Sequence, residues 1–133
     1  MTSEPRIEVE LRLTGDGFLP DRLTSVVQIV PTKTWRFGDS VQGTALRRKN
    51  DGWAYGLPPR ESYEVEALLR ELMDAIEPSR DRIIDAMKQF RLEASISFGI
   101  YISTRSPACW FSAESIGRIA ALGAGLDVDV IIS

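Results

Sequence analysis

Three stretches of the chain alternate between apolar and polar residues, and this alternation constrains the fold more than any other feature. The longest stretch runs from Leu92 to Ser103, and similar stretches cover residues 7–14 and 126–132. A period of two places apolar side chains on one face of a β-strand and polar side chains on the other. Each strand is therefore expected to be buried on one face only, as in a sheet that helices cover on one side.

Helical spacing of apolar residues appears between these stretches. Residues 65–76 carry valine, leucine, methionine and isoleucine every three or four positions, which predicts an amphipathic helix that starts near Ser62 as its N-cap. Pro78 separates it from a second predicted helix over residues 79–90. Two shorter helices are expected, one from Pro20 to Val30 before Pro31, and one from Ser112 to Leu122 before Gly123, with Ile116 on its buried side.

The predicted elements alternate in type along the 133 residues, and the length suits one domain covering residues 1–133. Two short strands are also expected, at "GWAYGL" from Gly52 and at "ACWFS" from Ala108. The order predicts an α+β fold built as a two-layer sandwich, with a mixed or antiparallel sheet and helices on one face. A ferredoxin-like arrangement is the specific expectation, although the strand order is left open.

Composition excludes several classes of function. The chain has no histidine and one cysteine, Cys109, so it lacks the commonest general base, the Ser-His and Cys-His pairs, and the usual zinc ligands. We therefore predict no catalytic residues, no metal and no cofactor. The net charge of -3 argues against nucleic-acid binding. No signal peptide or membrane-spanning run is visible, which predicts a cytoplasmic protein that does not engage a membrane.

The polar face of the three long strands is expected to be acidic. The acids on this face, set against Arg12 alone, are Glu8, Glu10, Glu93, Asp127 and Asp129. Tyr101 lies on the same face. This surface predicts docking of a basic protein, because opposite charges speed and orient an encounter. An ordinary solvated surface has the same composition, so both interpretations stay open. Asp127 and Asp129 alone supply too few oxygens for a calcium site.

The segment "PTKTWRFGD", residues 31–39, is typical of a corner, because a proline opens it and a glycine nearly closes it. We expect Trp35 and Trp53 to pack together as an aromatic plug at one end of the core. Arg36 and Asp39, with Trp35, also form a candidate contact surface beside the polar loop of residues 39–52. The basic residues 47–49 in that loop are expected to be solvated.

The chain resembles the bacterial domain-of-unknown-function family 4279. The resemblance rests on "PTKTWRFGD", "GWAYGL", the helix "EVEALLRELMDAIEP" and the ending "IGRIAALGAGLDVDVIIS", and it spans residues 7–132. It implies no catalytic residues. It does imply a role as an immunity protein, which binds and neutralises a toxin made by the same cell. Such toxins are often basic, which suits an acidic binding surface.

Three hypotheses follow. The first is a non-enzymatic binding protein, an immunity protein for a bacterial toxin, that uses the acidic sheet face or the loop of residues 39–52. The second is a small-ligand or regulatory domain with a pocket near Trp35 and Trp53. The third is an enzyme that uses Glu93, Asp129 and Tyr101, although nothing in the sequence brings these three side chains together.

Overall fold

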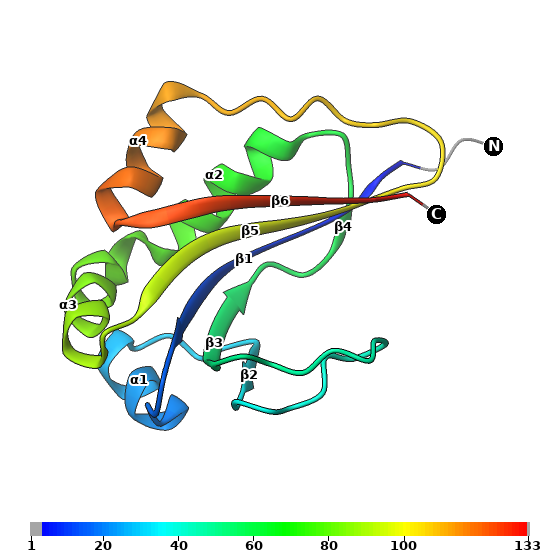
Figure 1. Cartoon of the computed structure of the whole chain (residues 1–133). Coiled ribbons are helices and arrows are strands. Elements are labelled where there is room, and N and C mark those ends of the chain that lie inside the picture. Colours follow the sequence, from blue (N-terminus) through cyan, green and yellow to red (C-terminus); the bar gives the residue numbers. More distant parts are fainter. Residues whose placement is uncertain (1–3, 133) are drawn as a thin grey trace.

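One mixed β-sheet, covered by helices on one face, makes up the computed structural model, which describes residues 4–132 (Figure 1). The strands are β1 (Arg6–Gly15), β2 (Lys33–Trp35), β3 (Asp51–Gly56), β4 (Arg60–Glu61), β5 (Glu93–Ile102) and β6 (Ala124–Ile132). The helices are α1 (Pro20–Val27), α2 (Val65–Ile76), α3 (Arg80–Phe90) and α4 (Ala113–Leu122), and the 3-10 turn η1 (Glu77–Ser79) joins α2 to α3. The α+β prediction, with helices on one face, is confirmed.

The strand order is β2-β3-β1-β5-β6, and β4 pairs with the first residues of β1. All these pairs are antiparallel except β5–β6, which is parallel and is connected through α4. In a ferredoxin-like sheet another strand separates the two strands that one helix joins. Here β5 and β6 are direct neighbours, which leaves β6 at the edge of the sheet.

The core lies between the sheet and the helices. The alternating apolar residues of β1 and β5 are buried, except for half-buried Ala94, and they face the apolar stripe of α2. Leu69 and Leu72 of that stripe are fully buried. Burying one such side chain stabilises a fold by about 1.5–3 kcal/mol, so this contact between helix and sheet is a large part of the stability. The predicted burial pattern of these three elements is confirmed.

Two helix boundaries differ from the prediction. Helix α1 ends at Val27, because Gln28 adopts a left-handed conformation with φ 59° and closes the helix with a hydrogen bond to Thr24. The proline at position 31 therefore does not end this helix, and Val30 is exposed. Helix α2 begins at Val65 without a side-chain cap, while the Ser62 hydroxyl accepts a hydrogen bond from the Glu64 backbone N–H.

The segment between β5 and α4 was expected to contain a strand, and this is wrong. Residues 105–112 form no strand or helix. Phe111 packs its ring 5.7 Å from that of Phe98, whereas Trp110 and Cys109 are exposed. Ser112 does cap α4, as predicted, by accepting a hydrogen bond from the Ser115 N–H. Ile116, expected to be buried, is exposed on the outer side of α4.

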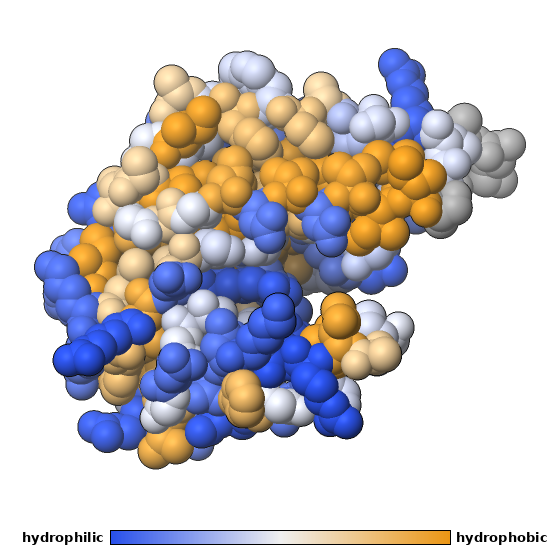
Figure 2. Space-filling model, in the orientation of Figure 1, coloured by the Kyte–Doolittle hydropathy of each residue, from blue (hydrophilic) through white to orange (hydrophobic). Residues whose placement is uncertain are grey.

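The surface shows one marked contrast. In Figure 2 hydrophobic atoms gather along β6, while hydrophilic atoms dominate the part of the molecule that contains β2, β3 and the loop between them. No helix within residues 4–132 is long and apolar enough to cross a bilayer.

Candidate functional site

The open face of the sheet gathers most of the residues that the alternation assigned to it. The strand register places Glu10, Ser97 and Asp127 in one row across β1, β5 and β6. The next row holds Glu8, Gly99 and Asp129 in the same order. The helices lie on the other face, so these side chains surround a surface that only the loop between β2 and β3 partly covers (Figure 1).

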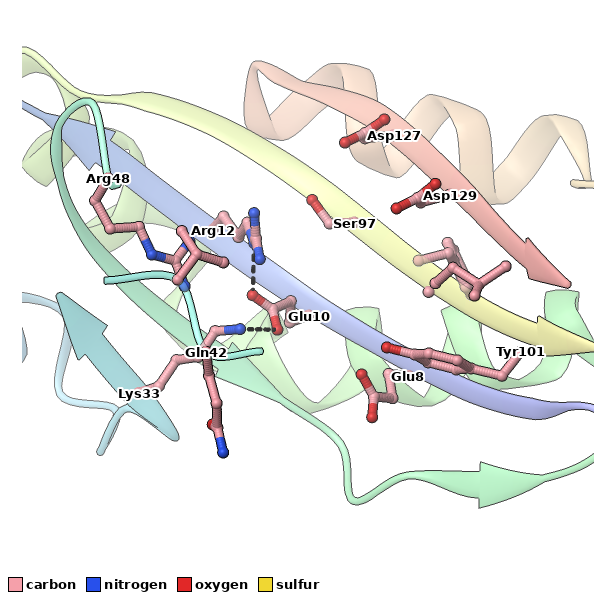
Figure 3. A pocket seen from close by; sticks show the side chains of 14 residues that line it. Glu8, Glu10, Arg12, Lys33, Gln42, Arg48, Ser97, Tyr101, Asp127 and Asp129 are labelled. Atoms are coloured by element: carbon pink, nitrogen blue, oxygen red, sulfur yellow. Dashed lines mark hydrogen bonds and ion pairs between the residues drawn. The ribbon is translucent and has the colours of Figure 1, made fainter. Parts of the chain in front are cut away.

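A groove of about 500 Å³ lies on this face. One wall comes from β2 and the following loop, with Lys33, Val41, Gln42 and Arg48. The opposite wall is β6, with Asp127, Asp129 and Ile131. Figure 3 shows the basic side chains on one side of the groove and the two aspartates on the other, with Ser97 between them and Tyr101 beside Glu8 toward one end. Gly99 has no side chain, which deepens the floor between Glu8 and Asp129.

The basic wall is built around one tryptophan. Trp35 is 94% buried, and the centroid of its ring lies 4.3 Å from the Arg48 guanidinium carbon and 5.4 Å from that of Arg12. The Lys33 ammonium lies 5.7 Å from the same ring. Such cation–π contacts hold the three positive charges in place over the ring. The face is therefore not the uniformly acidic surface that the sequence predicted, because β2 and the loop bring Lys33 and Arg48 onto it.

One carboxylate, that of Glu10, pairs with two of these three cations. Glu10 accepts a hydrogen bond from Arg12 Nε at 2.7 Å and forms an ion pair with Lys33 Nζ at 3.2 Å. Within residues 4–132 the Arg48 guanidinium forms no direct ion pair with a carboxylate, although Glu10 and Asp39 lie near it. The cluster therefore carries more positive than negative charge at the edge of the groove.

Two buried donors in this cluster are not satisfied. Trp35 Nε1 and Arg48 Nε have no hydrogen-bond partner among the described residues. Burial lowers the pKa of Arg48 from its ordinary value, the nearby Arg12 lowers it further, and Glu10 and Asp39 act in the opposite direction. A buried donor without a partner costs free energy, so an acceptor on a bound molecule would stabilise this wall.

The aspartate side chains of the acidic wall are exposed to solvent and unpaired among the described residues. Asp127 and Asp129 are exposed, and neither forms an ion pair with another described residue. At one end of the groove Glu8 is paired with Arg6, whose guanidinium lies 5.2 Å from the Tyr101 ring centroid. Two negative charges therefore remain available to a cationic group in the groove.

Glu93 is the one acid of the predicted face that lies far from this groove. It pairs with Thr14 at the start of β5, six residues from Gly99. That separation is about 20 Å along a strand. Glu93 therefore cannot act at one site with Asp129 and Tyr101.

The segment of residues 31–39 is the corner that the sequence predicted. The backbone turns from Arg36 to Asp39 with Gly38 at φ 87°, and the Asp39 carboxylate accepts a hydrogen bond from the Arg36 N–H. The Arg36 side chain forms an ion pair with buried Asp51 at 3.1 Å. Neither Arg36 nor Asp39 lines the groove, so both hold the corner together.

Trp35 and Trp53 do not form the expected plug. Trp35 pairs with Gly52 across β2 and β3, so Trp53 points to the opposite face of the sheet. There it is fully buried in the core and donates from Nε1 to the Thr24 hydroxyl at 3.0 Å. No pocket lies between the two tryptophans, because the sheet separates them. The groove is near Trp35 only.

Among residues 4–132 no group of three or more cysteine, aspartate or glutamate side chains is placed to hold a metal ion. No curated protein and no solved structure matches this chain. A family comparison matches residues 5–133, nearly the whole chain, to the family described as Domain of unknown function (DUF4279). The chain, with its half-covered sheet and charged groove, therefore belongs to this family.

Proposed function

We propose that this protein is a non-enzymatic binding domain and that its partner, another protein, binds in the groove on the open face of the sheet. The observation that carries the proposal is the pair of facing walls with opposite charge. Arg48 and its cationic neighbours stand on one side, and Asp127 and Asp129 stand on the other. Charged groups arranged in this way favour one orientation of a partner over others.

The groove defines what the partner must carry. A carboxylate on the partner would accept from the Arg48 guanidinium and would neutralise the excess charge beside Trp35. A lysine or arginine on the partner would face Asp127 and Asp129. The predicted partner is therefore a protein segment with charges of both signs, and its cationic residues face β6. Nucleic acid would meet the two aspartates unfavourably.

The finer form of the proposal is an immunity protein that acts in the bacterial cytoplasm on a toxin made by the same cell. Its support is the resemblance to a family with suggested immunity roles, together with a groove wall that suits basic residues of a toxin. The absence of histidine from the chain agrees with a protein that binds and does not catalyse.

Co-expression with a toxin encoded beside this gene tests the proposal. We expect the wild type to rescue growth and to co-purify with the toxin. Arg48→Gln and the double change Asp127→Asn with Asp129→Asn should each weaken the complex at least tenfold. Arg22→Gln and Asp85→Asn each remove one charge, positive and negative respectively, from exposed positions outside the groove and should have no effect. Full rescue by the groove variants would show that the toxin binds elsewhere, and no rescue by the wild type would refute the immunity role.

A second candidate function, binding of a small zwitterionic ligand, is favoured by the volume of the groove and by the unsatisfied donor Arg48 Nε of its lining. Ligand pockets commonly have about 300–1,000 Å³. Thermal-shift screening with amino acids and dipeptides tests it. Stabilisation that disappears in Arg48→Gln supports a ligand site, and no stabilisation by any of these compounds argues against one.

A further inference from the structure

The edge strand β6 has an apolar side that the helices leave uncovered. Leu126, Val130 and Ile132 point to the helix side of the sheet, yet they are 40%, 47% and 80% exposed. Helix α4 lies beside the start of β6, and the rest of the strand extends past it (Figure 1). Figure 2 shows the resulting band of hydrophobic atoms along the strand.

The outer edge of this strand is also free. Across residues 4–132, β6 pairs only with β5, so the backbone groups on its other side meet no further strand. Edge strands are usually protected by lysine, proline, a bulge or a covering segment. Residues 124–132 contain no lysine, arginine or proline, and they pair with β5 in unbroken register over all nine positions.

The other side of β6 is acidic. Asp127 and Asp129 point to the open face, and both lack an ion-pair partner among the described residues. In a sheet, residues directly opposite each other on neighbouring strands interact most strongly, and opposite charges there are favourable. A strand beside β6 would therefore be stabilised by cationic residues on the open face and by aliphatic residues on the helix side.

We propose that β6 is a strand-addition site for an extended protein segment in which lysine or arginine alternates with aliphatic residues. Backbone hydrogen bonds to the free edge hold the segment, its cations face Asp127 and Asp129, and its aliphatic side chains cover Leu126, Val130 and Ile132. The inference rests on the proposed function in one respect, that the partner is a protein. The strand-addition site itself is the edge of the sheet, beside the groove.

A second copy of this chain fits the edge less well. An antiparallel pair of β6 strands centred on Val128 places Asp127 of each chain opposite Asp129 of the other. Like charges directly opposite each other destabilise a strand pair. The charge pattern therefore favours a cationic segment from another protein.

The test uses the full chain and an eight-residue peptide of alternating valine and lysine with blocked ends. We expect the peptide to bind and to slow hydrogen exchange of β6 amides, as measured by NMR. A peptide with glutamate in place of lysine should bind at least tenfold more weakly. Two further peptides, N-methylated on all valines or on all lysines, test the backbone pairing. Residues of one set point their N–H groups toward β6, so one of these two peptides should lose binding and the other should keep it.

Protein variants locate the site. Val130→Lys places a cation on the exposed edge and should weaken peptide binding at least tenfold. Ile116→Lys adds the same charge on exposed α4 and serves as the matched control. Equal binding by both N-methylated peptides, or unchanged exchange in β6, would overturn the inference. Dimers of the wild type with protected β6 amides would also overturn it, because a second copy would then occupy the edge.

The same measurements separate this inference from the proposed function. Arg48→Gln should weaken a partner in the groove and leave the peptide bound to β6. If the peptide fails to bind while the toxin is captured, only the edge site is refuted. If the peptide binds while no toxin is neutralised, only the immunity role is refuted.

Discussion

At the scale of single residues, Asp51 is the residue whose importance the sequence least reveals. Its buried carboxylate accepts hydrogen bonds from the N–H groups of Gly17 at 2.7 Å and Phe37 at 2.8 Å, and from Arg36 Nε at 3.1 Å. It therefore joins the turn after β1 and the corner after β2 to the first residue of β3. The hydrogen bond from Phe37 lowers the pKa of Asp51, burial raises it, and the bonds from Gly17 and Arg36 lower it further, so that it ends below the ordinary value.

Replacement of Asp51 by asparagine should destabilise the fold. An amide nitrogen cannot accept a hydrogen bond, so one of the backbone donors loses its acceptor at a cost of about 1–3 kcal/mol. Because the folded-state pKa lies below the unfolded value of about 3.9, the charge of Asp51 stabilises the fold above that pH and stops doing so as the pH falls through the folded-state pKa. Urea unfolding of Asp51→Asn and wild type should therefore show a difference at pH 7 that shrinks in acid. Asp85→Asn, at an exposed position, is the control, and an equal loss in both variants would contradict the role of Asp51.

Gly52 makes room for Trp35, and this close approach gives a second prediction at the residue scale. A Cβ atom at position 52 would collide with the indole ring of Trp35. Gly52→Ala should therefore displace Trp35, lower the melting temperature and weaken binding in the groove, whose cations rest on that ring. Gly125→Ala, in a strand with open space around it, should leave both properties unchanged. Wild-type tryptophan fluorescence and stability in Gly52→Ala would show that the ring does not lie as described.

At the scale of elements, Glu66 of α2 holds the start of α4. Its carboxylate accepts hydrogen bonds from the Ser112 backbone N–H at 3.0 Å and hydroxyl at 3.1 Å, and from the Ser115 hydroxyl at 3.0 Å. Burial raises the pKa of Glu66, but the bonds from Ser112, Arg70 and Ser115 together bring it below its ordinary value. The carboxylate therefore stays charged near the N-terminus of α4, where the helix dipole favours negative charge.

Glu66→Gln should loosen α4 without unfolding the sheet. The amide keeps the size of the side chain but offers one acceptor oxygen in place of two, so some of the serine donors lose their acceptor. We expect a loss of about 1–3 kcal/mol in unfolding free energy and faster hydrogen exchange at the first turn of α4. Glu64→Gln, just before α2 and exposed, is the matched control. Unchanged exchange at residues 112–116 in Glu66→Gln would contradict this role.

The elements that the sequence predicted best are those whose pattern is local. The alternation placed β5 within a residue of its observed bounds, Glu93–Ile102, and helical spacing identified the stripe of α2. Strand β2 has three residues and β4 has two, which is too short for any period to show. The end of α1 was missed because it depends on a left-handed glutamine, a conformation that glycine more often adopts.

At the scale of the whole molecule, the acids of the site and Arg12 were predictable, whereas Lys33 and Arg48 were not. The alternation of apolar and polar residues along the strands was enough to place Glu10, Asp127 and Asp129 on one face. Arg48 reaches that face only because the loop between β2 and β3 folds over it, and Lys33 depends on the pairing of β2 with β3. Contacts of this kind join residues far apart in the chain, and periodicity carries no information about them.

The same loop contributes to the groove but not to the hydrophobic core, so a change in it should alter binding without altering stability. Ser40 and Arg47 pair as in a hairpin, and the intervening segment contributes Val41 and Gln42 to the groove but nothing to the core. Replacing residues 41–46 by Asn-Gly, a two-residue turn that closes hairpins, should therefore preserve the fold. Shortening a loop changes its closure free energy by well under about 1 kcal/mol, so the melting temperature should move little.

The shortened loop should weaken binding in the groove. Arg48 remains, but one wall of the groove becomes shorter, and the affinity for the groove partner should fall at least tenfold. The β6 peptide should bind as before, because its edge lies across the sheet from this loop. Undiminished binding of the groove partner by this variant would place the functional surface outside the groove.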